Sequence, residues 1–250
     1  MALPASEVYS PIPYEALSAD ESLKQLRSAG EFILENSNNP KEYKQAILSE
    51  SVKAIFYRNI SETDEHAKDN YVRRVFALIE GVFIDERGLI ERGIKAEVCT
   101  RHALYDLGFD MHEPTKRDDY SAIDIFADAK GESGPILAIQ IKADANLDEP
   151  LVVNLSTPNL PLGIKEGSQA EKDAAVAFGR INTRIKSREF LRAHPEFTDK
   201  DIIPMMVRVP SGKGGIHGTM SAFKRTGEPA LGFTGKLYDR LERSLGWEEY

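Results

Sequence analysis

Three polar residues interrupt two apolar segments in the middle of the chain, and their types suit hydrolytic chemistry. Asp124 lies within the apolar run 122–127, and Gln140 and Lys142 lie within the next one, 135–142. Because strand side chains alternate between the faces of a sheet, Gln140 and Lys142 point to the same side. If the two strands are neighbours, a carboxylate, an amide oxygen and an ammonium converge. The oxygens suit a hard cation such as Mg²⁺, and the lysine can orient water or stabilise charge on a phosphate.

The elements that must position these residues alternate between helical and strand patterns. Their order is helix, strand, strand, strand, helix, strand, and we expect them at 89–107, 109–113, 122–127, 135–142, 168–193 and 202–209, with a further short strand at 151–155. This order predicts an α/β (α+β) fold in which helices cover a sheet.

The rest of the chain divides by composition and periodicity. Residues 1–17 carry three prolines and predict an irregular arm, whereas 18–84 have helical spacing and no strand signal. We expect helices from 18 to about 35, after Pro40, and from 61–64 onward. The predicted organisation is therefore the arm, a helical region for dimerisation or DNA recognition (18–84), the core (85–210) and a C-terminal loop and helix (211–250).

The polar motif and the element order together resemble the PD-(D/E)xK nuclease superfamily, and in particular the Mrr-type restriction nucleases. The matching segments are Leu107-Gly108-Phe109, Ala122-Ile123-Asp124-Ile125 and Gln140-Ile141-Lys142, and the resemblance covers roughly residues 88–210. It implies a restriction-endonuclease-like αβββαβ core with a mixed central sheet. It also implies a metal-dependent endonuclease that hydrolyses DNA phosphodiester bonds in a type II-like restriction or defence role.

The resemblance also implies roles for individual residues. Asp124, Gln140, Lys142 and an acid from the first core helix are the expected catalytic group. Glu97 is the first choice for that acid, ahead of Glu91 and Glu80. Mg²⁺ or Mn²⁺ is expected on Asp124, Glu97 and the backbone carbonyl of Ile141. The family's usual middle acid is Gln140 here, and its usual proline before the aspartate is replaced by Ala122-Ile123.

Gln140 favours an alternative from a different class, a catalytically inactive protein of this fold that binds nucleic acid or a partner protein. A third interpretation also remains, in which Asp124 and Lys142 are surface residues on edge strands. A metal-binding comparison of the wild type with Asp124→Ala separates a functional nuclease from an inactive one.

A basic segment supports nucleic-acid binding in this otherwise acidic chain. The whole protein has a net charge of −8, but residues 164–225 contain twelve Lys or Arg against seven Asp or Glu. Arginines four residues apart on one helix predict a stripe that contacts phosphates. The candidate DNA-binding residues are Arg180, Arg184, Lys186, Arg188, Arg192 and, in a Gly-rich loop, Lys213. The expected partner is double-stranded DNA, cut by a homodimer; a solvated helix face is the plain alternative.

Several protein classes are excluded or disfavoured by composition. No apolar run approaches the roughly 18–20 residues of a membrane span. The N-terminal residues lack the basic start and apolar core of a secretory signal. The single cysteine, Cys99, excludes an internal disulfide and suits a reducing compartment. We therefore expect a cytoplasmic protein without a membrane partner.

Overall fold

The computed structural model describes residues 14–36, 40–80, 87–128, 134–156, 164, 167–212 and 221–247. The chain forms two compact units. The first comprises Met1–Val98 with Arg225–Glu228, and the second comprises Cys99–Lys224 with Pro229–Tyr250. The division falls inside helix α4 (Arg87–Asp106), beyond the end of the helical region predicted at 84.

The described part of residues 18–84 forms helices joined by short connections, as the periodicity of this region predicts. The first unit contains the 3₁₀ turn η2 (Tyr14–Ala16), α1 (Ala19–Asn36), α2 (Pro40–Ser61), α3 (Glu65–Glu80) and the start of α4. The backbone N–H and hydroxyl of Ser18 donate to Glu21, which satisfies groups at the start of α1. Its apolar core includes Leu26, Ile55, Val75 and Val98.

The end of the predicted irregular arm is ordered in this unit. The Tyr14 side chain is buried, and its hydroxyl donates to Glu50 across 2.9 Å. Residues 1–13 of the arm lie outside the described residues.

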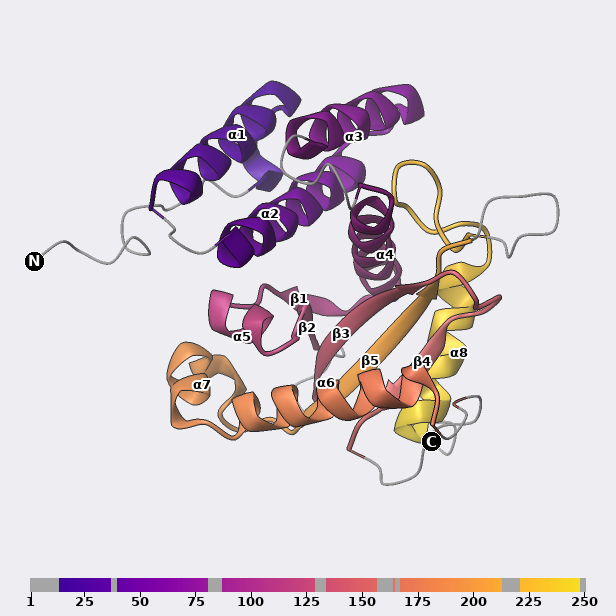
Figure 1. Ribbon diagram of the computed structural model, residues 1–250. Helices are drawn as coiled ribbons and strands as arrows, with labels where there is room; N and C mark the ends of the chain where they lie inside the picture. Colours follow the sequence, from indigo (N-terminus) through magenta and orange to yellow (C-terminus); the bar gives the residue numbers. More distant parts are fainter. Residues whose placement is uncertain are drawn as a thin grey trace, which may run out of the picture. The chain divides into compact units, whose positions relative to one another are not determined.

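The second unit is built on a five-stranded mixed sheet with the order β1-β2-β3-β5-β4 (Figure 1). The strands are β1 (Asp110–His112), β2 (Ile125–Asp128), β3 (Ile136–Asp144), β4 (Leu151–Asn154) and β5 (Ile202–Pro210). β3 runs parallel to β5, and the other three pairings are antiparallel. The α+β class and every strand expected from the sequence are present.

Helices cover this sheet and complete its core. One face packs against α6 (Gln169–Ile185), with Ala138 and Met206 meeting Ala177 and Ile181. α8 (Phe233–Leu245) packs against β4, and the Ser244 hydroxyl donates to the Val152 carbonyl. The alternation of β3 therefore places its even-numbered residues on the α6 face.

Two local features differ from the expectation. The single helix predicted at 168–193 is wrong: α6 ends at Ile185, and the separate helix α7 (Arg188–Ala193) starts after its N-cap Ser187, whose hydroxyl accepts from the Phe190 backbone N–H. A short helix, α5 (Lys116–Tyr120), was not predicted, although Thr115 and Asp118 form a reciprocal capping box at its start. The 3₁₀ turn η3 (Pro195–Phe197) follows α7.

Candidate functional site

Asp124 lies directly before β2, and the sheet register sets it beside β3. The β2–β3 ladder ends at the pair Ile125–Ile139, and the Asp124 N–H donates to the Ile139 carbonyl across 2.8 Å. Asp124 therefore lies one residue beyond this register, bonded to Ile139 rather than paired with Gln140. The Asp124 carboxylate lies close enough to Lys142 for the positive charge of that lysine to lower its pKa.

The Asp124 carboxylate replaces a missing strand partner. Because the ladder stops at Ile139, the next outward N–H of β3 in this direction, that of Ile141, has no β2 residue to donate to. It donates instead to Oδ2 of Asp124 across 2.6 Å. Oδ1 accepts no hydrogen bond from any residue that the structure describes. One carboxylate oxygen is thus fixed by the backbone and the other is available to a ligand.

Gln140 and Lys142 lie on either side of the point where β3 changes from buried to exposed residues. Residues 136–141 are buried, and Lys142 is the first exposed residue of the strand. Gln140 is 7% exposed, yet its amide makes no hydrogen bond within the described chain, and Lys142 likewise has no hydrogen bond or ion pair there. Polar groups at a protein's interior edge are normally satisfied. Three neighbouring groups here retain unused bonding capacity.

A buried arginine fixes the backbone of Asp124 from the other side. Nη2 of Arg101, on α4, donates to the Asp124 carbonyl across 2.9 Å. The guanidinium also makes two hydrogen bonds to Glu113, the shorter of 2.6 Å. The N–H and the carbonyl of Asp124 are therefore both held, which limits movement of its carboxylate.

A second buried network holds the segment that leads into Asp124. Asp118, on α5, is fully buried and accepts from Arg184 Nε at 2.6 Å, while its other oxygen lies 2.8 Å from His194 Nε2. The Asp118 carbonyl accepts from the Ile123 N–H. Between them Ala122 has a φ of 65°, a left-handed conformation that a residue with a Cβ rarely adopts. The network thus anchors a strained turn two residues before Asp124.

The electrostatics of the site are set by burial and by nearby charges. Loss of water raises the pKa of Asp124 to about 6, although the Ile141 hydrogen bond and the positive charges of Lys142 and Arg101 act in the opposite direction. Asp119, on α5, adds a second negative charge that also raises this pKa. A bound cation would remove the cost of ionising Asp124 there.

Asp119 and Arg208 are the residues near the site that sequence reasoning missed. Arg208 pairs with Lys142 in the β3–β5 register and forms an ion pair of 2.8 Å with Asp144. Neither has a motif of its own. The Asp119 position depends on the unpredicted helix α5, and Arg208 could have been found from its place in an apolar strand, where a charged residue needs an explanation.

The expected metal ligands are only partly brought together. Asp124 and Ile141 are adjacent, whereas Glu97 is half-buried on α4 within the first unit, and its role stays a prediction. In the described part of the chain, no group of three or more His, Cys, Asp or Glu side chains is placed to hold a metal ion. The unused Oδ1 of Asp124 and the unbonded Gln140 amide are oxygen donors of the kind that Mg²⁺ and Mn²⁺ accept.

The predicted arginine stripe is wrong as a continuous surface. Arg184 is 5% exposed and is bonded to Asp118 and Ser187, so its side chain belongs to the core. The helix break places Arg180 on α6 and both Arg188 and Arg192 on α7. These three arginines and Lys186 are exposed. Lys213 lies outside the described residues.

Comparison of the chain with protein-family models, curated proteins and solved structures gives no match. Among the described helices, none combines the length and apolar character needed to cross a membrane.

Proposed function

We propose that this protein is a metal-dependent endonuclease that hydrolyses DNA phosphodiester bonds, of a type II-like restriction or defence kind. The observation that supports this most is the position of the Asp124 carboxylate, which accepts a hydrogen bond from the N–H of Ile141, the residue between Gln140 and Lys142, and which lies within electrostatic reach of Lys142. The side chains of Asp124, Gln140 and Lys142 all have bonding capacity that no described residue uses. A carboxylate, an amide and an unpaired ammonium suit a site that binds a divalent cation beside a phosphate.

This proposal assigns a separate role to each residue of the site. Asp124, with Glu97 and the carbonyl of Ile141, would hold Mg²⁺ or Mn²⁺. Such an ion supplies Lewis-acid chemistry, drawing charge from the phosphate and favouring deprotonation of the attacking water. Lys142 orients that water and stabilises negative charge as it develops on the phosphate oxygens. Gln140 contributes a neutral oxygen to the same pocket in place of a second carboxylate.

The DNA partner and the assembly belong to the same proposal. Arg180, Lys186, Arg188 and Arg192 are exposed cations that can contact phosphates, which position a protein on a duplex without reading its sequence. Cleavage of both strands requires two active sites, and a homodimer with two-fold symmetry is the simplest assembly that provides them. A cytoplasmic location agrees with such a substrate.

The test is incubation of the purified full chain with plasmid, phage and methylated DNAs in the presence of Mg²⁺ or Mn²⁺. We expect discrete fragments or linearised plasmid with the wild type, none in excess EDTA, and none with Asp124→Asn. Persistent cleavage by Asp124→Asn would place the activity elsewhere or in a contaminant.

Gln140 supports one alternative, a non-catalytic protein of the same fold that binds nucleic acid or a partner. That alternative predicts DNA binding in EDTA that is unchanged by Asp124→Asn, and no cleavage with any of these substrates under either metal ion. The same binding and cleavage assays therefore separate the two functions.

A further inference from the structure

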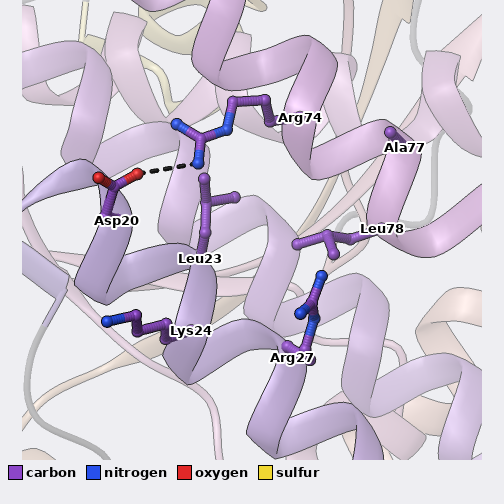
Figure 2. A pocket seen from close by; sticks show the side chains of 7 residues that line it. All are labelled: Asp20, Leu23, Lys24, Arg27, Arg74, Ala77 and Leu78. Atoms are coloured by element: carbon purple, nitrogen blue, oxygen red, sulfur yellow. Dashed lines mark hydrogen bonds and ion pairs between the residues drawn. The ribbon is translucent and has the colours of Figure 1, made fainter.

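The helical unit contains a pocket of about 530 Å³ between α1 and α3, apart from the residues of the proposed nuclease site (Figure 2). Its walls come from one face of each helix, because the lining positions follow helical spacing. The lining residues are Asp20, Leu23, Lys24 and Arg27 from α1, and Arg74, Ala77 and Leu78 from α3.

The side chains that line this pocket carry a net positive charge. Its lining has three basic side chains and one carboxylate, and that carboxylate, Asp20, is paired with Arg74 across 2.8 Å. Arg27 has no hydrogen bond or ion pair with any described residue, and its guanidinium is turned toward Leu78. Lys24 also forms no ion pair there, although it lies near enough to Glu21 to affect it electrostatically. Two cations therefore lack a matching anion in the pocket, and a bound anion would relieve their mutual repulsion.

The apolar part of the lining favours an anion that also carries an apolar group. Leu23 is buried, Leu78 is half-buried, and Figure 2 shows the two side chains between the Arg74 and Arg27 guanidiniums. Pockets for small organic ligands usually span about 300–1,000 Å³ and combine an apolar surface with a few placed polar groups. The volume and the mixed lining fit a molecule larger than inorganic phosphate.

We propose that this pocket binds a phosphate-bearing small molecule of nucleotide size. Arg27 and Arg74 bind the phosphate oxygens, because guanidinium groups pair well with phosphate, and the apolar portion of the ligand packs on Leu23 and Leu78. Asp20 opposes this binding, since it occupies Arg74 and adds the pocket's one negative charge. Such a site gives the protein a ligand response that is independent of phosphodiester hydrolysis.

The experiment measures binding of ATP, adenosine and inorganic phosphate to the full chain by isothermal titration calorimetry in EDTA. We expect ATP to bind more tightly than inorganic phosphate, and adenosine to bind at least tenfold more weakly than ATP. Equal binding of adenosine and ATP would contradict an anion site. Absence of ATP binding, together with binding of a short DNA duplex that Arg27→Gln weakens, would assign the pocket to nucleic acid and overturn the proposal.

Matched variants give effects of opposite sign. Arg27→Gln should weaken ATP binding about tenfold, because a charge-assisted hydrogen bond is lost. Asp20→Asn should strengthen it, because Arg74 is released. Arg73→Gln removes the same charge from a neighbouring arginine that pairs with Asp69 outside the pocket, and it should leave the affinity unchanged. The proposal fails if Arg27→Gln and Arg73→Gln behave alike. Lys142→Ala should bind ATP as the wild type does, which excludes the nuclease site as the source.

Discussion

The Asp124 carboxylate accepts a hydrogen bond of 2.6 Å from the Ile141 backbone N–H, so the side chain of the residue before β2 completes the hydrogen bonding of β3. The bond ties the carboxylate to the strand that carries Gln140 and Lys142. It also occupies only Oδ2, which leaves the other oxygen for a ligand. The position of the acid therefore depends on where the β2–β3 ladder ends.

The first prediction concerns the effect of ionised Asp124 on the stability of the folded state. Its pKa of about 6 lies above the ordinary value for an aspartate, so the folded state takes up a proton more readily than the unfolded chain. Ionised Asp124 is therefore unfavourable at pH 7. We expect Asp124→Asn, which keeps an oxygen for the Ile141 N–H, to raise the free energy of unfolding by about 1–3 kcal/mol at that pH.

The pH dependence of the stability difference between Asp124→Asn and the wild type tests whether ionised Asp124 destabilises the fold. Between about pH 4 and 6 the folded wild type binds more protons than the unfolded chain, so its stability rises as pH falls through this window. The advantage of Asp124→Asn should therefore shrink from pH 7 to about pH 4. Urea denaturation of both proteins measures it, and an advantage that grows on acidification would contradict the account.

The second prediction concerns the missing acid at Gln140. Gln140→Glu adds a carboxylate beside Asp124, and a second anionic oxygen should bind a divalent cation more tightly. We expect Mn²⁺ affinity to rise by roughly tenfold with DNA cleavage retained. Calorimetric titration with Mn²⁺ measures the change. Gln169→Glu, an exposed residue on α6, is the control and should not alter the affinity.

The third prediction concerns the buried network behind the Ala122 turn. Burial raises the pKa of Asp118, but hydrogen bonds from Thr115, His194 and Arg184 outweigh it and hold the pKa below the usual range. Asp118→Asn leaves the Arg184 charge poorly compensated in the core, so we expect a loss of about 3 kcal/mol at pH 7.

A lowered pKa stabilises the folded state above the ordinary aspartate value and loses that effect as pH falls through the folded value. The stability gap between the wild type and Asp118→Asn should thus be constant near neutral pH and narrow below about pH 4. Asp199→Asn, at an exposed position, should match the wild type throughout. A gap that stays constant down to pH 2 would mean that Asp118 ionisation contributes nothing.

The fourth prediction separates two arginines that are four residues apart. Arg180→Gln removes an exposed cation, so duplex affinity should fall, with the salt slope reduced by about one unit and the melting temperature unchanged. Arg184→Gln removes a core ion pair and should lower the melting temperature instead. Fluorescence anisotropy over a salt series and thermal unfolding measure the two effects. If the salt dependence of Arg180→Gln equals that of the wild type, Arg180 does not contact DNA phosphates and its side chain is only solvated.

Strand positions were predictable because a buried sheet requires apolar runs, and a polar residue such as Asp124 within such a run is conspicuous. The break between α6 and α7 was not predicted, although Ser187 is an N-cap residue that sequence alone can suggest. Four-residue spacing treats every arginine as exposed, and only the tertiary structure shows that Arg184 pairs with Asp118 in the core. Asp119 could not be recognised from the sequence for a similar reason, since its effect on the pKa of Asp124 depends on the turn at Ala122.

The central claim is that Lys142 acts in phosphodiester hydrolysis, and its direct test is the single-turnover rate of DNA cleavage with Mg²⁺. Loss of one group that stabilises developing charge costs roughly a hundredfold or more in rate. We therefore predict that Lys142→Ala cleaves at least about a hundredfold more slowly while its Mn²⁺ and DNA affinities stay near wild type, and that Lys172→Ala, at an exposed position on α6, cleaves normally. Wild-type cleavage by Lys142→Ala would contradict the account, because the active site would then lie elsewhere.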